Sequence, residues 1–528
     1  MRVWGILAAV AVATPAVAQD RAVADVAVEE VALSDLSAAI TSGRTTSESA
    51  TRAYLARIAA MDRTGPTLRS VIATNPDAIA QARALDAERR AGRVRGPLHG
   101  VPILIKDNIE TRDAMPTTAG SLALKDNLTN RDAPVAARLR AAGAVILGKT
   151  NLSEWANIRS SRSMSGWSAV GGLVRNPYAL NRTACGSSSG TGASIAASFA
   201  AGGLGTETDG SVVCPSAING LVGLKPTVGL VSRTHVVPIS HSQDTPGPMT
   251  RSVRDAAMLF SAMIGDDPAD MATKGADARR RDYAAGLASA TLKGLRIAVL
   301  RPDMAPDLKA RFDAALEVLK RGGATLVDVT RPATPGLGEA EQLVLHTELK
   351  ADLDAYLATT PAAVTTRMLD AVIAFNDANA RQEMPYFAQE TFLAAAKTKG
   401  LADPAYLAAR EKSRTAAAGA IDAMLKDANA SVLVSPSYGA AWFADPVHGD
   451  RSTGASASQL PAVSGYPHLT VPMGLVDSLP VGISFIGTAY SEAQLLGAGY
   501  AYEQMSKARV APRYLAEADA GPGMEGVR

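Results

Sequence analysis

The chain has 528 residues, 47% of them hydrophobic and 20% charged, which is ordinary for a soluble globular protein. Its length suggests two to four domains and a large buried core. The formal net charge is only +2, from 53 basic and 51 acidic residues, and no long basic run occurs, so we expect no nucleic-acid partner.

The first 20 residues predict an export signal. Arg2 precedes a short apolar run, and residues 16–18 (Ala-Val-Ala) form the small-x-small pattern of a cleavage site. A membrane anchor is the alternative, but the apolar stretch is short and Pro15 interrupts it. We therefore expect a signal peptide over 1–18, a linker over 19–30, a periplasmic or secreted protein, and no membrane association after cleavage.

Hydrophobic periodicity and turn residues predict alternating helices and strands through the first half of the chain. The expected elements are two amphipathic helices within 31–62, a buried strand over 101–105 that ends at Lys106, a helix over 134–143, a strand over 144–147 and a strand–helix–strand unit over 295–329. Strands that alternate with helices indicate an α/β sheet.

Residues 335–430 differ in composition from their surroundings. They are rich in alanine, leucine and charged residues, which predicts a helical insertion, and strand patterns return over 431–436 and 469–486. Core elements on both sides of the helical stretch indicate one discontinuous domain. The predicted division is 31–334 and 431–510 for this domain, 335–430 for an insertion that contributes to a substrate pocket, and 511–528 for a C-terminal tail.

The segment from Thr183 to Pro226 is unusually rich in glycine and serine within an apolar context. It contains two short loops, CGSSSG over 185–190 and TDGS over 208–211. Glycine allows sharp turns that bring amide N–H groups close to a ligand. Hydroxyls between glycines suit a serine nucleophile beside an oxyanion hole, the set of N–H donors that holds a negatively charged reaction intermediate.

A flexible linker is the alternative interpretation of such a composition. The run between the loops favours folded structure instead. Residues 191–201 are small and apolar and predict a buried helix, with the hydroxyls of residues 187–189 as its N-terminal cap, and the LGTET run that follows predicts a strand.

The two cysteines, Cys185 and Cys214, lie beside the two loops. An exported compartment permits a disulfide. Small buried thiols are nevertheless common core residues, and we favour free thiols.

One further motif, residues 143–150 (GAVILGKT), fits the pattern of a phosphate-binding loop. Its central residues, however, have the composition of a buried strand rather than of a turn whose N–H groups face phosphate. We therefore expect no nucleotide cofactor.

A serine nucleophile needs a proton acceptor. None of the six histidines shows a recognisable triad spacing, although His235 and His241 lie near the loops in sequence and remain alternatives, and no histidine–carboxylate cluster predicts a metal site. Lys106 ends an apolar strand, so burial would favour its neutral form; lowering its pKa from about 10.4 to near 7 requires roughly 4.6 kcal/mol. The alternative is a solvated lysine or one paired with Asp107.

Lys106, the CGSSSG loop and the run DGSVVCP followed by GLVGLKPT together resemble the amidase signature family, whose members hydrolyse amides with a Ser–cis-Ser–Lys triad. The similarity extends from about Leu33 to Arg509 and includes LPVGISFIG over 479–487. It implies an α/β fold with a mixed β-sheet core, helices on both faces and a helical insertion. It implies neither cofactor nor metal.

The resemblance also implies roles for individual residues. Ser211 matches the nucleophile, Ser187 the bridging serine that follows a cis peptide bond, and Lys106 the base. The backbone N–H groups of Thr208, Asp209, Gly210 and Ser211 match the oxyanion hole, and Gly186 and Ser188 match residues that support the loop.

Two positions depart from the family pattern, because Asp209 and Val213 stand where many members have glycine and arginine. With these departures the chain most resembles the bacterial peptide amidases, which implies release of ammonia from C-terminal amides of peptides. A general aliphatic or aryl amidase, the glutamine-hydrolysing component of an amidotransferase, and a non-catalytic exported binding protein remain alternatives.

Overall fold

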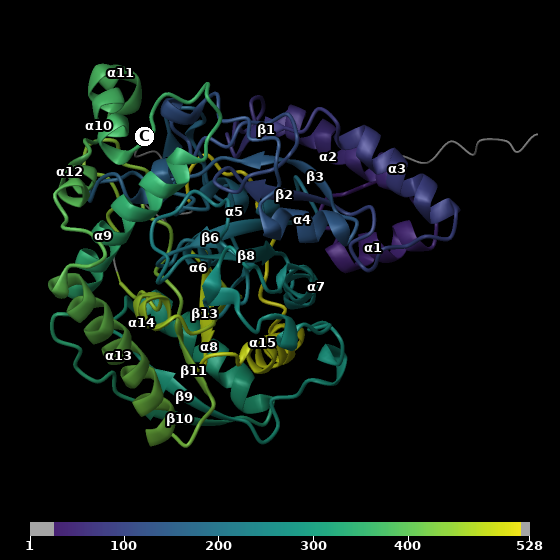
Figure 1. Ribbon diagram of the computed structural model, residues 1–528. Coiled ribbons are helices and arrows are strands. Elements are labelled where there is room, and N and C mark those ends of the chain that lie inside the picture. Colours follow the sequence, from purple (N-terminus) through teal and green to yellow (C-terminus); the bar gives the residue numbers. More distant parts are fainter. Residues whose placement is uncertain (1–25, 453, 519–528) are drawn as a thin grey trace, which may run out of the picture.

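The computed structural model describes residues 26–452 and 454–518 (Figure 1). The signal peptide expected over 1–18 lies outside these residues. Within them, eleven strands form one mixed sheet in the order β1 (Val71–Thr74), β3 (Val145–Thr150), β2 (Pro102–Lys106), β6 (Gly202–Glu207), β8 (Thr245–Thr250), β7 (Val222–Lys225), β12 (His468–Val476), β13 (Leu479–Ile486), β11 (Val432–Pro436), β9 (Arg296–Leu300) and β10 (Thr325–Val329). A separate pair consists of β4 (Trp167–Ser168) and β5 (Gly172–Leu173).

The strand that ends at Lys106 lies inside this sheet. β2 runs parallel to β3 on one side and to β6 on the other, and all five of its residues are buried. Parallel strands that are covered on both faces need apolar side chains throughout, which explains why this strand has no polar alternation. The pairing of β2 with β6 also brings together the ends of two strands that carry candidate site residues.

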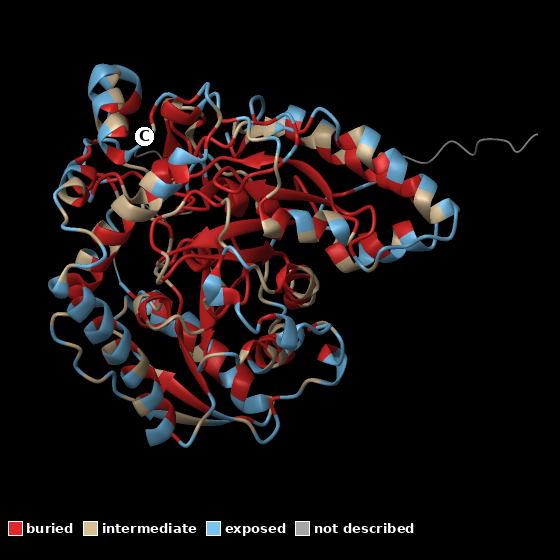
Figure 2. Cartoon of the chain, viewed as in Figure 1, coloured by how far each residue is buried: buried red, intermediate tan, exposed pale blue. Residues whose placement is uncertain are grey.

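Helices cover the central sheet, whose strands are buried almost throughout (Figures 1 and 2). The covering helices are α1 (Leu33–Thr41), α2 (Ser47–Met61), α3 (Ala78–Arg90), α4 (Pro134–Ala141), α5 (Ser189–Ala196), α6 (Val213–Ile218), α7 (Val253–Met263), α8 (Pro306–Arg321) and α15 (Glu492–Ser506). Short 3-10 helices occur at Leu122–Leu124, Glu154–Asn157, Met271–Thr273, Asp277–Arg279 and Leu287–Ser289.

Two glycines of β6 show how closely helices approach both faces. A Cβ atom on Gly202 would lie 2.9 Å from a Leu259 methyl group of α7. On the next residue, Gly203, it would lie 2.9 Å from Thr191 of α5. Because successive strand residues point to opposite faces, α7 and α5 sandwich this strand, and glycine leaves room for both.

The stretch over 335–430 is helical, as its composition predicts. It contains α9 (Leu337–Ala358), α10 (Leu369–Ala378), α11 (Ala380–Glu383), α12 (Glu390–Ala396) and α13 (Pro404–Asp427), and α14 (Gln459–Ser464) follows after β11. The long helices α9 and α13 pack together beside the sheet (Figure 1). The division into a discontinuous domain and an insertion stays a prediction. In the part of the chain that the structure describes, no helix has the length and apolar character to cross a bilayer.

Candidate active site

Lys106 lies at the end of β2 and is completely buried. Its Nζ donates hydrogen bonds to Ser187 Oγ at 2.7 Å, to Thr206 Oγ1 at 2.9 Å and to the Thr206 carbonyl at 3.3 Å. Burial lowers the pKa of Lys106 to about 7, against the opposing effect of the Asp244 and Glu207 carboxylates. The Lys106 amine can therefore be neutral near pH 7, and it is neither solvated nor paired with Asp107.

The Asp107 carboxylate turns to other groups. It accepts a hydrogen bond from the Thr118 hydroxyl, and Lys149 Nζ lies 3.9 Å away. Burial raises the pKa of Asp107 to about 6. Asp107 therefore pairs with Lys149, and Lys106 bonds to the serine loop instead.

The Gly186–Ser187 peptide bond is cis, as the family resemblance implies. Ser187 is fully buried, and its carbonyl accepts a hydrogen bond from the Ser153 N–H at 3.0 Å. A Cβ atom on Gly186 would lie 2.3 Å from Ser153 Oγ and 2.9 Å from Ser165 Oγ. Only glycine fits at this position, while the loop-supporting role of Gly186 stays a prediction.

The hydroxyls of Ser188 and Ser189 do not cap α5, contrary to the prediction. Ser188 Oγ donates to the Thr206 carbonyl at 3.1 Å and accepts from the Thr206 N–H at 3.2 Å, while Ser189 Oγ donates to the Cys185 carbonyl. Both hydroxyls hold the loop itself and its neighbour β6 instead of the helix end. The loop-supporting role of Ser188 stays a prediction.

Ser211 lies in the turn between β6 and α6. Its carbonyl accepts a hydrogen bond from the Ser188 N–H at 3.2 Å, which joins the two serine loops. The Ser211 hydroxyl forms no hydrogen bond with any residue that the structure describes, so its link to Ser187 is not formed here. Gly210, directly before it, has a φ of +77°, a backbone conformation that favours glycine.

The turn also presents free backbone donors. Among the described residues, the N–H groups of Thr208, Asp209, Gly210 and Ser211 meet no protein acceptor. The next two N–H groups differ, because Val212 and Val213 donate to Glu207 Oε2 at 2.8 and 2.9 Å. Glu207 thus anchors the start of α6 and leaves the four preceding amides available to an oxyanion.

A family model for amidases matches residues 49–496, which is most of the chain. The chain belongs to the amidase family. The native peptide amidase from Stenotrophomonas maltophilia is 49% identical with a TM-score of 0.87, and the match covers 92% of this chain and 99% of that one. A probable amidase of Arabidopsis thaliana is 38% identical over 90% of this chain and 89% of its own length.

Relatives with another role are also similar. A component of the glutamyl-tRNA(Gln) amidotransferase of Thermobifida fusca is 36% identical over 87% of this chain and 93% of its own length. Together the comparisons confirm the resemblance to the amidase signature family and the predicted α/β fold. They show that this chain is an amide-hydrolysing enzyme, which excludes the alternative of a non-catalytic binding protein.

In this amidase, Asp209 of the turn after β6 meets a second carboxyl group, Glu341 of α9. Burial and the charge of Glu341 raise the pKa of Asp209 to about 7. Glu341 accepts hydrogen bonds from the side-chain amides of Gln243 and Gln459, both at 3.1 Å. Gln243 also donates to the Thr208 carbonyl at 3.2 Å, so α9 is connected to the turn between β6 and α6. Glu341 was not predicted from the sequence, because helical periodicity does not reveal which face meets a distant loop.

Cys185 and Cys214 form a disulfide, with Cα atoms 6.0 Å apart, so the preference for free thiols was wrong. The physical reason is the contact between the two serine loops. The Ser188 N–H donates to the Ser211 carbonyl, and each cysteine lies three residues from one end of that hydrogen bond. The position of one cysteine beside each loop was the available signal.

The two alternative histidines make other contacts. His235 lies 3.9 Å from Glu110. His241 Nδ1 lies 2.9 Å from Asp352 and its Nε2 lies 3.2 Å from Glu348, both on α9. Within the described residues neither histidine bonds to a candidate serine.

The His241, Glu348 and Asp352 side chains together bring nitrogen and carboxylate atoms within 4.8 Å of one another, an arrangement that can hold a metal ion. No such cluster was predicted from the sequence, because its carboxylates come from a helix far away along the chain. Glu348 already accepts hydrogen bonds from Tyr406, Ser240 and Ser242. These contacts account for the cluster as an ion pair that joins the loop before β8 to the helical stretch.

Proposed function

We propose that this amidase releases ammonia from the C-terminal amides of peptides, with Lys106, Ser187 and Ser211 as its catalytic residues. The observation that carries the proposal is the 2.7 Å contact between a completely buried lysine amine and Ser187 Oγ. Similarity to the Stenotrophomonas maltophilia peptide amidase over almost its whole length supports the choice of substrate.

The reaction starts with neutral Lys106, which takes the proton of the Ser187 hydroxyl. Ser187 in turn takes the proton of Ser211 as Ser211 Oγ attacks the amide carbon. The Ser211 hydroxyl can rotate toward Ser187 without breaking a bond to any described residue. The amides of residues 208–211 then bind the oxyanion, a contribution of roughly 3–4 kcal/mol per donor.

The second half of the reaction reverses this path. The proton returns through Ser187 to the leaving nitrogen, and ammonia departs from the acyl-enzyme. Water then attacks the ester, with Lys106 again accepting a proton through Ser187. A base with a pKa of about 7 suits both directions, because neither its neutral nor its charged form is strongly disfavoured.

The test measures ammonia release from amidated peptides, simple aliphatic and aryl amides, free glutamine and free asparagine. We expect the peptide amides to give the highest kcat/KM and the Ser211→Ala and Lys106→Ala variants to be inactive. Equal or faster turnover of simple amides would make the enzyme a general amidase, and a preference for glutamine would favour the amidotransferase alternative. Either result overturns the peptide assignment.

We also propose that the protein is exported after removal of residues 1–18. The Cys185–Cys214 disulfide supports this, because disulfides persist in oxidising compartments. Mass spectrometry of the protein from its native host should find a mature chain that begins at Gln19. Recovery of the full-length chain from the cytoplasm would contradict the proposal.

A further inference from the structure

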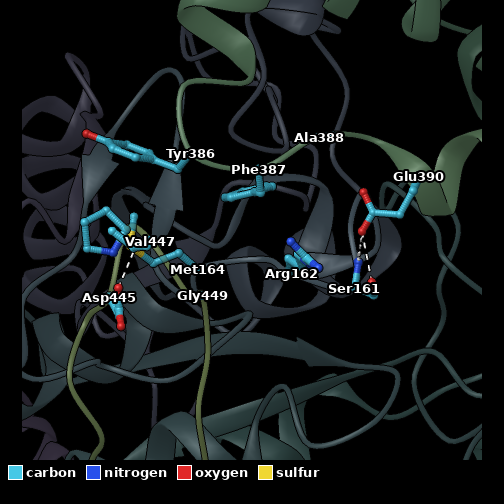
Figure 3. A pocket seen from close by; sticks show the side chains of 11 residues that line it. Ser161, Arg162, Met164, Tyr386, Phe387, Ala388, Glu390, Asp445, Val447 and Gly449 are labelled. Atoms are coloured by element: carbon cyan, nitrogen blue, oxygen red, sulfur yellow. Dashed lines mark hydrogen bonds between the residues drawn. The ribbon is translucent and has the colours of Figure 1, made fainter.

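A cavity of about 540 Å³ lies between three segments that are distant in sequence (Figure 3). Its walls come from residues 161–164, from the loop over 386–390 at the start of α12, and from residues 445–449. Met164 and Phe387 form a buried apolar wall, while Tyr386 and Val447 are 48% and 79% exposed at its rim. A cavity that combines an apolar wall with polar side chains can bury part of a ligand.

The apolar wall is firmly built. Phe387 and Tyr386 pack edge-on against Trp167, with ring centroids 5.3 and 5.6 Å away. The guanidinium of the buried Arg159 lies 4.3 Å from the centre of the Phe387 ring, and it is held by Glu154 at 2.9 Å. The wall therefore keeps its shape without a ligand.

Three charged side chains line the cavity, and two of them already form hydrogen bonds with other residues of the protein. Glu390 accepts hydrogen bonds from the Ser160 hydroxyl and from the N–H and hydroxyl of Ser161, at 2.7–2.9 Å. Asp445 accepts from the N–H groups of Val447 and His448 and lies 2.7 Å from His448 Nδ1.

Arg162 is the exception. Its guanidinium has no hydrogen-bond or ion-pair partner among the residues that the structure describes. Arg162 nevertheless lines the cavity together with the apolar side chains (Figure 3). An arginine in this position offers a fork of donors to a carboxylate. A ligand that combines an anion with apolar groups satisfies both features of the cavity.

The cavity adjoins the serine loop through the segment that follows Met164, and the segment that follows Gly449 joins that segment there. Ser165, one residue beyond Met164, packs against Gly186, since a Cβ there would lie 2.9 Å from Ser165 Oγ. Asp450, one residue beyond Gly449, accepts from the Ser165 N–H at 3.1 Å and from the Ser165 hydroxyl at 2.6 Å. The two segments that bound the cavity thus meet beside the cis peptide bond.

We propose that this cavity binds an acidic residue of the peptide substrate, upstream of the amidated residue, with Arg162 as the partner of its carboxylate. The inference rests on the proposed peptide amidase function. It adds a preference for the amino-acid sequence of the substrate peptide. A peptide whose terminal amide reaches Ser211 extends along residues 162–165, so that a glutamate or aspartate side chain enters the cavity. The apolar walls contact the methylene groups of that side chain and its neighbours.

The test uses acetylated peptide amides in which glutamate and glutamine are exchanged one, two or three residues before the amidated residue. At one of these positions we expect glutamate to give a KM lower by roughly fivefold, the factor that corresponds to about 1 kcal/mol. Arg162→Gln should erase this difference with kcat unchanged, and Arg162→Lys should keep part of it. The difference should also shrink at high salt, because the pair is near solvent.

Two controls separate the cavity from the reaction. Arg93→Gln, a change of another exposed arginine outside the cavity, should leave the glutamate preference intact. An acetylated single-residue amide, which has no upstream residue, should be hydrolysed equally by wild type and Arg162→Gln. An equal KM for glutamate and glutamine at every position, or a preference that survives in Arg162→Gln, overturns the inference.

Binding to the Ser211→Ala variant, measured by calorimetry with the same peptides, distinguishes failure of the inference from failure of the proposed function. If the enzyme hydrolyses peptide amides but binds glutamate and glutamine peptides equally, only the acidic cavity is wrong. If no peptide amide is hydrolysed, yet glutamate peptides bind more tightly in an Arg162-dependent way, the cavity stands and the reaction is wrong.

Discussion

Replacement of Lys106 tests the proposed base most directly. Burial brings its pKa from 10.5 to about 7, so about half of the amine is neutral at pH 7, against roughly one part in three thousand for an ordinary lysine. In wild type, kcat/KM for a peptide amide should rise with pH up to about 7 and then level off. Lys106→Met should remove the activity, because no other described group donates to or accepts from Ser187 Oγ.

The same change should affect stability with a definite pH dependence. Because the pKa in the folded state is lower than in the unfolded chain, the folded state binds fewer protons between pH 7 and 10.5, and Lys106 destabilises the fold below that window. The full effect is roughly 5 kcal/mol at 1.36 kcal/mol per pH unit. Lost hydrogen bonds to Ser187 and Thr206 offset part of it, at about 1–3 kcal/mol for each buried group left without a partner.

The assay combines pH–rate profiles from pH 5 to 9 with denaturant unfolding of wild type and Lys106→Met at pH 6 and pH 10. We expect the variant to gain stability relative to wild type at pH 6 and to lose that advantage at pH 10. Three results would refute the conclusion that Lys106 is neutral in the folded state. They are a flat wild-type rate profile, full activity in the variant, and a stability difference that is the same at both pH values.

Three further predictions concern the relay, the disulfide and the ion-pair cluster. Ser187→Ala should leave a small residual kcat with KM little changed, because the position of Ser211 is unaltered. The assay measures ammonia release, and full activity of the variant would show that Ser187 does not take part in the reaction. Cys185 and Cys214 are 29 residues apart, so reduction of their disulfide should lower the unfolding free energy by roughly 3–4 kcal/mol. Thermal unfolding should then show a lower Tm, and an unchanged Tm would show that the bond is not formed. The hydrogen bond that His241 donates to the Asp352 carboxylate raises the pKa of His241, so this pair stabilises the fold at pH values below the ordinary histidine pKa and the contribution is lost as pH rises through the raised value. Asp352→Asn should therefore cost stability at pH 5.5 and much less at pH 9, and an equal loss at both pH values would count against a titrating His241.

Much of the architecture was predictable because each element has a local signal. The strand that ends at Lys106 and the unit over 295–329 appear where apolar runs and turn residues place them. The two serine loops were recognisable for the same reason, since glycine and serine at fixed spacings describe a turn with exposed donors. The family resemblance then assigned roles that composition alone left open.

The missed features all depend on contacts between distant segments. The disulfide required knowing that the Ser188 amide meets the Ser211 carbonyl. Glu341 and the His241 cluster required the placement of α9 against the loops before β8 and after β6. The serines before α5 show the opposite error, because a good local capping signal was overridden by stronger demands for hydrogen bonds inside the loop.

The charges around Lys106 explain why burial alone does not make a useful base. Desolvation acting alone would lower the pKa of the amine further, and an amine that does not bind a proton cannot pass one on. Asp244 and Glu207 oppose desolvation by favouring the charged form. Both carboxyl groups have raised pKa values themselves because they are buried, and the pKa of Asp244 is about 6. The negative charge of Asp244 is therefore lost as pH falls through about 6. Because protonation of Asp244 removes a charge that raises the pKa of Lys106, the activity of the site should decline below pH 7 more gradually than a single isolated base requires.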